Sequence, residues 1–236
     1  SALASVQAML ENYPRVLLIC TLRPNFAGEA LPPDADRLEL KGFRDDLYEA
    51  TKRYFKYYRI DWSDATWRLE LFDHPLKLRM FCEVTNPTRD KIVGLEAMPT
   101  SLTALFDRYL DQVAERIEEL SHRSYRYFES DIRTALNSIG LALWDAKTRR
   151  IDKDELRRLL GDETRPWDQS IVRALEHDGV LIRVPGYGSS AGDVTVVYDM
   201  LAGHIVADAL INQHSGNDFQ SWLSHVDTVS QFSMAY

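Results

Sequence analysis

The sequence predicts a mainly α-helical fold with a small amount of β structure. Two patterns favour it: apolar residues recur at helical spacing through most of residues 43–123, and residues 124–211 read as three helices followed by a hairpin. A third pattern, the apolar run at residues 16–20, is typical of a strand buried on both faces of a parallel sheet. We therefore expect the end of an α/β core in residues 1–42, an all-helical domain, a winged-helix domain, and in residues 212–236 the start of a C-terminal helical region or a packing tail.

Composition and charge argue against several classes of protein. The chain has 236 residues, of which 45% are hydrophobic, and a formal net charge of -8. This balance disfavours a dedicated nucleic-acid or membrane-surface binder, whose affinity would come from clustered lysine and arginine. The two cysteines, Cys20 and Cys82, lie far apart in apolar runs, as buried thiols do. Without a run of membrane-spanning length or a signal peptide, we expect a cytoplasmic protein that does not contact a membrane.

The first part of the chain is organised around the apolar run at residues 16–20. Only residues 1–14, whose apolar positions follow a helical spacing, precede this run, and the sequence soon turns helical after it. A short second strand is predicted at residues 37–40 from alternating polar and apolar side chains. Because a buried strand needs neighbours, we expect the other strands of the sheet to belong to a larger protein of which this chain is a fragment.

The end of the first strand is a candidate ligand site. Pro24 has no N–H to donate and would end the strand, which places Thr21 and Arg23 at its carboxyl end. Open α/β sheets bind their ligands at that end of the strands. Arginine is the side chain best suited to phosphate, although an ordinary surface arginine would give the same pattern.

Four helices are expected in the all-helical domain. They are predicted over residues 44–58, 64–72, 75–84 and 101–122. Pro75 is favoured at a first helical position because its missing N–H would have been unpaired anyway, and either Asp73 or His74 would cap that helix. The last of the four carries a continuous apolar stripe and is expected to pack along its whole length.

Residues 124–211 carry the clearest pattern of helix and strand signals in the sequence. Ser130 is expected to cap the first helix, Ile151 to be a strand remnant, and residues 152–155 to form a capping box that opens the second helix. A third helix over residues 168–177 would end at Gly179, which suits the left-handed conformation. Two strands, at residues 180–184 and 194–197, would form the hairpin. This order of three helices and a hairpin is a winged helix.

A winged helix raises the question of DNA binding. The expected recognition helix carries Arg173 but also Asp168 and Glu176, whereas phosphate contacts require local positive charge. The basic residues of 147–158 alternate with acidic ones, which is typical of a solvated face with paired charges. We therefore do not expect DNA as a partner. The alternative function is a winged-helix transcriptional regulator or a protein-interaction module with an N-terminal helical domain.

The order of these motifs resembles one family. A strand ending Thr-Leu-Arg-Pro, a helix that starts His-Pro-Leu, and a winged helix followed by Tyr-Asp-Met and an Ala-rich helix resemble the STAND class of P-loop NTPases, particularly the NACHT and bacterial antiviral (Avs) branches, over residues 6–211. The resemblance implies a cytoplasmic ATP/ADP-dependent signalling switch in antiphage defence. ADP would lock a closed monomer, and ATP would permit homo-oligomerisation once a C-terminal sensor, absent here, detects a trigger protein.

The resemblance also implies roles for particular residues. Arg23, next to Thr21 on the strand end, resembles the sensor 1 arginine that faces the γ-phosphate. Pro75 resembles the proline of a Gly-x-Pro motif that packs near the adenine, with Asp73-His74 in place of the glycine. The Met-His-Asp motif of related proteins falls at Val197-Tyr198-Asp199, and Tyr198 could hydrogen-bond a phosphate oxygen without histidine's charge.

The motifs that hold phosphate and metal are missing. No Gly-x4-Gly-Lys-Ser/Thr and no apolar strand ending in paired acids occur in the sequence. The resemblance implies a parent ATPase that uses ATP or ADP with Mg²⁺, so the chain's own upstream P-loop region is an expected partner. The chain alone is expected to be inactive and to bind no nucleotide tightly. No histidine has ligand spacing with a cysteine, so we assign no catalytic or metal-ligating residue.

Overall fold

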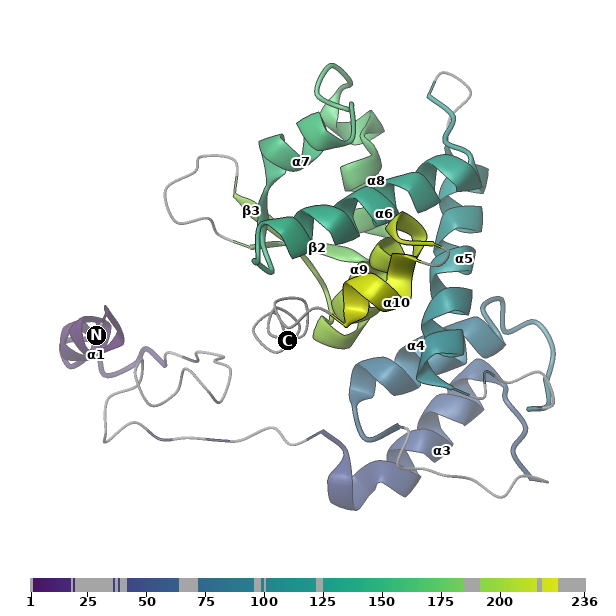
Figure 1. Ribbon diagram of the computed structural model, residues 1–236. Coiled ribbons are helices and arrows are strands. Elements are labelled where there is room, and N and C mark those ends of the chain that lie inside the picture. The colour runs from purple at the N-terminus through teal and green to yellow at the C-terminus, as the bar shows by residue number, and fades with distance from the viewer. Residues whose placement is uncertain are drawn as a thin grey trace. The chain divides into compact units, whose positions relative to one another are not determined.

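The computed structural model describes most of the chain after residue 42 and part of it before. The described residues are 2–17, 19, 36, 38, 42–63, 72–95, 99, 101–121, 125–184, 192–215 and 218–224. The chain divides into two compact units, Ser1–Gly42 and Phe43–Tyr236 (Figure 1). None of the described helices is both long and apolar enough to cross a membrane.

In the first unit, α1 (Ala2–Leu10) forms where helical spacing predicted it, but the prediction of a buried strand at residues 16–20 is wrong for the residues described. Val16, Leu17 and Ile19 are not in a strand, and Leu17 and Ile19 are 82% and 79% exposed. A strand is stabilised by ladder hydrogen bonds to its neighbours, and none of these three residues has such a neighbour among the described residues. Thr21, Arg23 and nearly all of the strand predicted at 37–40 lie outside the described residues.

The second unit begins with helices. These are η1 (Arg44–Asp46), α3 (Leu47–Tyr58), α4 (Pro75–Thr85) and α5 (Leu102–Leu120). Three of the four predicted helices are thereby confirmed, while the one predicted at 64–72 falls almost entirely outside the described residues. His74 supplies the α4 cap, because its Nδ1 accepts the N–H of Leu76 at 3.2 Å. Asp73 instead forms an ion pair with Lys77.

The described residues of the rest of this unit form five helices, one 3₁₀ turn and a small sheet. The elements are α6 (Glu129–Asp145), β1 (Ile151–Asp152), α7 (Lys153–Leu159), η3 (Trp167–Gln169), α8 (Ile171–His177), β2 (Leu181–Val184), β3 (Asp193–Val196), α9 (Asp199–Gln213) and α10 (Asp218–Leu223). The sheet has the order β1-β3-β2 and is antiparallel throughout, with Ile151 opposite Val194 and Leu181 opposite Val196. The predicted helices, strand remnant and hairpin of residues 124–211 are therefore present.

Two predicted helix starts need correction. The N-cap of α6 is Phe128 rather than Ser130. The Asp131 carboxylate, in the first turn of the helix, accepts the Phe128 N–H at 2.9 Å. Ser130 lies inside the helix, where its carbonyl accepts the Thr134 hydroxyl. The helix predicted at 168–177 is broken at Ser170, whose Oγ caps α8 by accepting the N–H of Arg173 at 3.1 Å. In both cases the helix begins where a side-chain oxygen, of Asp131 or of Ser170, can accept a backbone N–H at the start of the helix.

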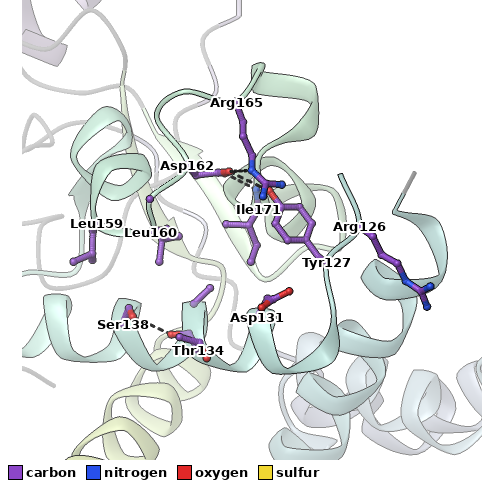
Figure 2. Close-up of a pocket in the computed structure, with 12 residues that line it drawn as sticks. Arg126, Tyr127, Asp131, Thr134, Ser138, Leu159, Leu160, Asp162, Arg165 and Ile171 are labelled. Carbon is purple, nitrogen blue, oxygen red and sulfur yellow. Dashed lines mark hydrogen bonds and ion pairs between the residues drawn. The ribbon is translucent and has the colours of Figure 1, made fainter. Parts of the chain in front are cut away.

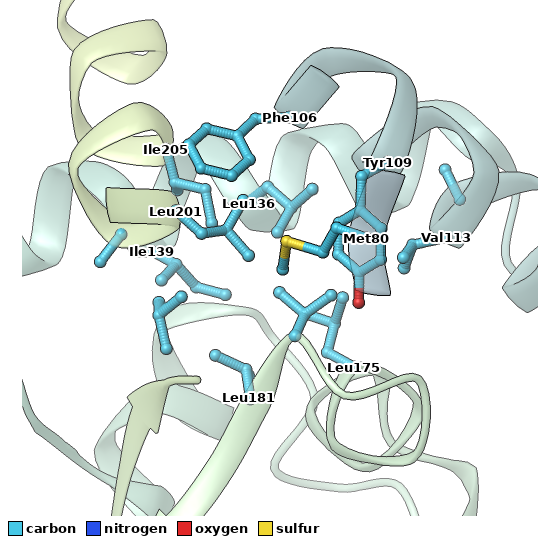
Figure 3. Packing of buried hydrophobic residues seen from close by; sticks show 14 of the residues in the cluster. Met80, Phe106, Tyr109, Val113, Leu136, Ile139, Leu175, Leu181, Leu201 and Ile205 are labelled. Atoms are coloured by element: carbon cyan, nitrogen blue, oxygen red, sulfur yellow. The ribbon is translucent and has the colours of Figure 1, made fainter. Parts of the chain in front are cut away.

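The buried side chains of the described residues in the second unit form one hydrophobic core (Figure 3). Met80 of α4 and Phe106, Tyr109 and Val113 of α5 pack with side chains of the later helices and the sheet. Those later side chains are Leu136, Ile139, Leu175, Leu181, Leu201 and Ile205. Helix α5 contacts α4 and also α6, α8 and α9, so the early helices and the hairpin part bury their apolar faces against each other (Figure 1).

Two buried tyrosines make stability depend on pH. Burial, with a further contribution from the Glu83 charge, raises the pKa of both Tyr58 and Tyr109 to about 12. An unfolded tyrosine has a pKa of about 10. Between pH 10 and 12 the unfolded chain therefore loses protons that the folded chain keeps, and stability falls as pH rises. We expect denaturation midpoints to decline over this range, and Tyr109→Phe to flatten the decline. If the midpoints of Tyr109→Phe declined with pH as steeply as those of the unaltered protein, burial of Tyr109 would not be a cause of the decline.

Candidate functional site

Two of the segments singled out in the sequence meet at the starts of α4 and α9. The His74 ring stacks on the Tyr198 ring, with centroids 5.0 Å apart and planes inclined by 26°. His74 is followed by Pro75, the first residue of α4, and Tyr198 by Asp199, the first residue of α9. We call these four residues together with Asp73 the α4–α9 junction. Segments far apart in the sequence thus present a ring pair, a proline and two carboxylates at one place.

The hairpin and α5 position Tyr198. Strand β3 ends at Val196, the Val197 N–H bonds the Val180 carbonyl at 2.9 Å, and Tyr198 then stays extended before α9 begins. The Phe106 ring of α5 meets Tyr198 edge to face at 6.2 Å. The Tyr198 hydroxyl donates to the Met200 sulfur at 2.9 Å. Burial, together with the charges of Asp73 and Asp199, raises the Tyr198 pKa, so the ring stays neutral.

Each carboxylate of the junction has a cationic partner. Asp73 pairs with Lys77, and Asp199 pairs with Arg149 at 3.1 Å. The first turns of α4 and α9 also direct partial positive charge here. The stacked rings and Pro75 offer a flat, mainly apolar surface, which suits a planar ring better than an ion. A phosphate fits less well, because it would lie near two carboxylates and because the Tyr198 hydroxyl already donates its hydrogen bond to the Met200 sulfur.

The structure therefore brings together three of the five predicted site residues. Pro75, Tyr198 and Asp199 lie at the junction, whereas Thr21 and Arg23 lie outside the described residues. From the sequence, His74 was predicted as a possible helix cap and as part of the Asp73-His74-Pro75 segment, but neither His74 nor Arg149 was predicted as a site residue. The aromatic character of His74 directly before Pro75 was a usable signal for the first, but nothing in the local sequence pairs Arg149 with Asp199.

A separate cavity of about 320 Å³ lies between α6 and the end of α7 (Figure 2). At its edge the buried Asp162 carboxylate accepts the Ile171 N–H at 2.6 Å and the Tyr127 hydroxyl at 3.1 Å, and it pairs with Arg165. Figure 2 shows the Tyr127 and Arg165 side chains converging on Asp162. Because the chain itself satisfies this carboxylate, we assign the cluster a structural role.

Other reactive groups are also engaged or buried. Burial raises the pKa of the Cys82 thiol well above its usual range, which keeps it protonated and unreactive. His204 on α9 lies 2.9 Å from Asp107 on α5, a contact that joins two helices. Among the described residues, no group of three or more His, Cys, Asp or Glu side chains could hold a metal ion.

Comparisons with protein-family models, with curated proteins and with solved structures found no match to this chain.

Proposed function

We propose that this chain is the C-terminal part of the NTPase module of a STAND-class P-loop NTPase, and that the parent protein is an ATP/ADP-dependent signalling switch in bacterial antiphage defence. The stacking of His74 on Tyr198 carries the proposal. It joins the Pro75 segment to the Tyr198-Asp199 segment, and the family resemblance assigns both of these to one nucleotide site. If the two motifs were chance matches, there would be no reason for the Pro75 segment and the Tyr198-Asp199 segment to meet in the fold.

The order of elements supports a winged helix within this proposal. Helix α6, strand β1, helices α7 and α8, and the β2–β3 hairpin follow the order of that domain, with β1 paired to β3. Helix α8 is tied to α5, since Arg116 pairs with Asp178 at 2.8 Å and the Tyr109 hydroxyl donates to the Asp178 carbonyl. Arg173 of α8 faces Glu176 at 3.7 Å. These contacts favour a protein-packing role for the winged helix over DNA recognition.

The nucleotide would be held mainly by residues outside those described. The chain's own contribution is the junction: Pro75 and the stacked rings would cover the adenine, and Lys77 and Arg149 balance the carboxylates beside it. A bound ATP would supply the γ-phosphate that distinguishes the two states of the switch. A ligand shifts an equilibrium only through its different affinity for the two states. Arg23 is the residue proposed to sense that difference.

Replacing Arg23 with alanine in the intact protein tests this function. Loss of a charge-assisted hydrogen bond to the γ-phosphate costs about 1.5 to 3 kcal/mol, so ATP should bind about tenfold or more weakly while ADP binding is unchanged. The variant should fold normally but fail to oligomerise when triggered with ATP. Calorimetry with each nucleotide and light scattering measure the two effects.

Three outcomes would contradict the proposal. Equal loss of ATP and ADP affinity would give Arg23 a structural role, and unchanged oligomerisation would remove Arg23 from the site. An upstream coding sequence without a P-loop would reject the NTPase assignment as a whole.

A further inference from the structure

Three tyrosines and two arginines on α3 and α4 line an open cavity of about 350 Å³. Its lining residues are Arg53, Tyr54, Tyr57, Tyr58 and Arg79. The Tyr54 and Tyr58 rings are nearly parallel, with planes inclined by 9°, and Tyr57 is 64% exposed. Tyr58 belongs to the core and Tyr54 is half-buried against it, so Tyr57 is the ring of this set whose exposure core packing does not explain. We call this set, with Arg89, the tyrosine–arginine face.

The face is positively charged in a chain that is negatively charged overall. The Arg89 guanidinium lies 4.7 Å from the centroid of Tyr57, beside Arg53 and Arg79 of the cavity lining. The carboxylates here are Glu49 and Glu83. Each accepts the Nε–H of one arginine, Arg53 at 3.1 Å and Arg79 at 2.7 Å. A guanidinium has four further N–H donors on its terminal nitrogens, so both arginines can still bind an anion.

A buried framework holds Arg89 in place. Arg89 has a φ of 60°, a left-handed conformation that a non-glycine residue adopts at a cost of about 1 kcal/mol. The buried Asn86 side chain fixes this loop: its Nδ2 donates to the carbonyls of Tyr58 and Lys91 at 2.8 Å, and its Oδ1 accepts the Arg89 N–H. Arg59 adds a hydrogen bond to the Asp90 carbonyl at 3.0 Å. This network fixes the backbone of the loop from which the Arg89 side chain reaches the Tyr57 ring.

Flat rings interleaved with cations suit one class of ligand. Aromatic side chains stack on nucleobases whatever the base, and neighbouring lysine and arginine side chains bind the phosphates between them. A single nucleotide would use one ring and one cation, whereas this face carries the exposed Tyr57 ring, the half-buried Tyr54 ring and three guanidinium groups. A duplex keeps its base faces stacked inside and could use only the cations. We propose that the tyrosine–arginine face binds single-stranded nucleic acid, independently of the nucleotide site proposed above.

Fluorescence anisotropy on the full chain tests this inference. The probes are a labelled oligothymidine of about 16 nucleotides, the upper end of known site sizes, and a duplex of the same length. The single strand should bind more tightly than the duplex, and its affinity should fall as salt rises. Tyr57→Ala should weaken single-strand binding about tenfold, since stacking one base contributes about 1 to 3 kcal/mol. Tyr57→Phe should retain binding, because stacking needs the ring and not the hydroxyl.

Two exposed residues elsewhere provide matched controls. Tyr13→Ala removes a tyrosine that is 58% exposed in the other unit, and Arg158→Ala removes an exposed arginine of α7; both should leave binding unchanged. The inference is overturned if the duplex binds as tightly as the single strand, or if Tyr57→Ala has no more effect than Tyr13→Ala. It is equally overturned if thymidine monophosphate or a phosphopeptide binds as tightly as the oligonucleotide. None of these results would affect the ATP and ADP measurements on Arg23.

Discussion

Asp162→Ala is expected to lower the free energy of unfolding by about 3 kcal/mol. The Asp162 side chain is 3% exposed and accepts the N–H of Ile171, the residue that begins α8. Removing the carboxylate leaves that buried N–H without its acceptor and separates Arg165 from its charge partner. The Tyr127 hydroxyl retains its bond to the Gln169 carbonyl, so the loss falls mainly on the start of α8.

Chemical denaturation of Asp162→Ala and Asp168→Ala measures this effect. Asp168 lies nearby in η3 and is exposed, so its replacement should change stability by no more than about 0.5 kcal/mol. Asp162→Asn, which keeps one acceptor for the Ile171 N–H, should lie between the two. Equal midpoints for Asp162→Ala and Asp168→Ala would show that the carboxylate does not hold α8 in place.

Gly140→Ala is expected to destabilise the protein by about 2 kcal/mol, although alanine is the better helix former. A Cβ at position 140 of α6 would lie 2.6 Å from the Ile205 carbonyl oxygen and 2.7 Å from the Ala209 Cβ, both on α9. Neither neighbour is the end of a flexible side chain that could move aside. The two helices would have to separate, and α6 packs against α9 more extensively than against any other described element.

The sign of the change distinguishes the two effects at Gly140. Helix propensity alone would make the alanine variant more stable by about 1 kcal/mol, so a rise in the thermal midpoint would reject the close approach of α6 and α9. Gly94 provides the matched control, because a Cβ there would meet nothing within 4 Å. Gly94→Ala should therefore be neutral or slightly stabilising.

The predicted helices were confirmed where the signal was local. Two neighbouring residues define the start of α4: Pro75 lacks an N–H, and the His74 side chain accepts the Leu76 N–H. All three residues are consecutive in the sequence. Most of the apolar stripe predicted for α5 is buried, from Leu105 to Ile117, since a repeat at three and four residues predicts the buried face of a helix without knowledge of its partner. The prediction that α5 packs along its whole length is wrong at its end, where Leu120 is 70% exposed. Asp152 likewise caps α7 through the N–H groups of Asp154 and Glu155.

Errors arose where two local signals competed or where a partner was needed. Ser130 has the side chain of a good cap, but α6 begins two residues earlier than this prediction, because the Asp131 carboxylate accepts the Phe128 N–H. The apolar run at residues 16–20 has the composition of a strand, yet its described residues are exposed, since a strand exists only beside another. Asp162 follows a glycine in what reads as a polar turn, and nothing nearby in the sequence marks it as buried.

By itself, the sequence determined the positions of most helices in residues 43–215 and the order of helices and hairpin, because periodicity, caps and breakers act within a few residues. It also singled out Pro75, Tyr198 and Asp199. Only the tertiary structure decided that His74 stacks on Tyr198, that α6 and α9 meet at Gly140, and that Asn86 fixes Arg89 against Tyr57. These contacts join segments distant in the chain, and they exist because burying the apolar faces of α4, α5, α6 and α9 in one core brings those surfaces together.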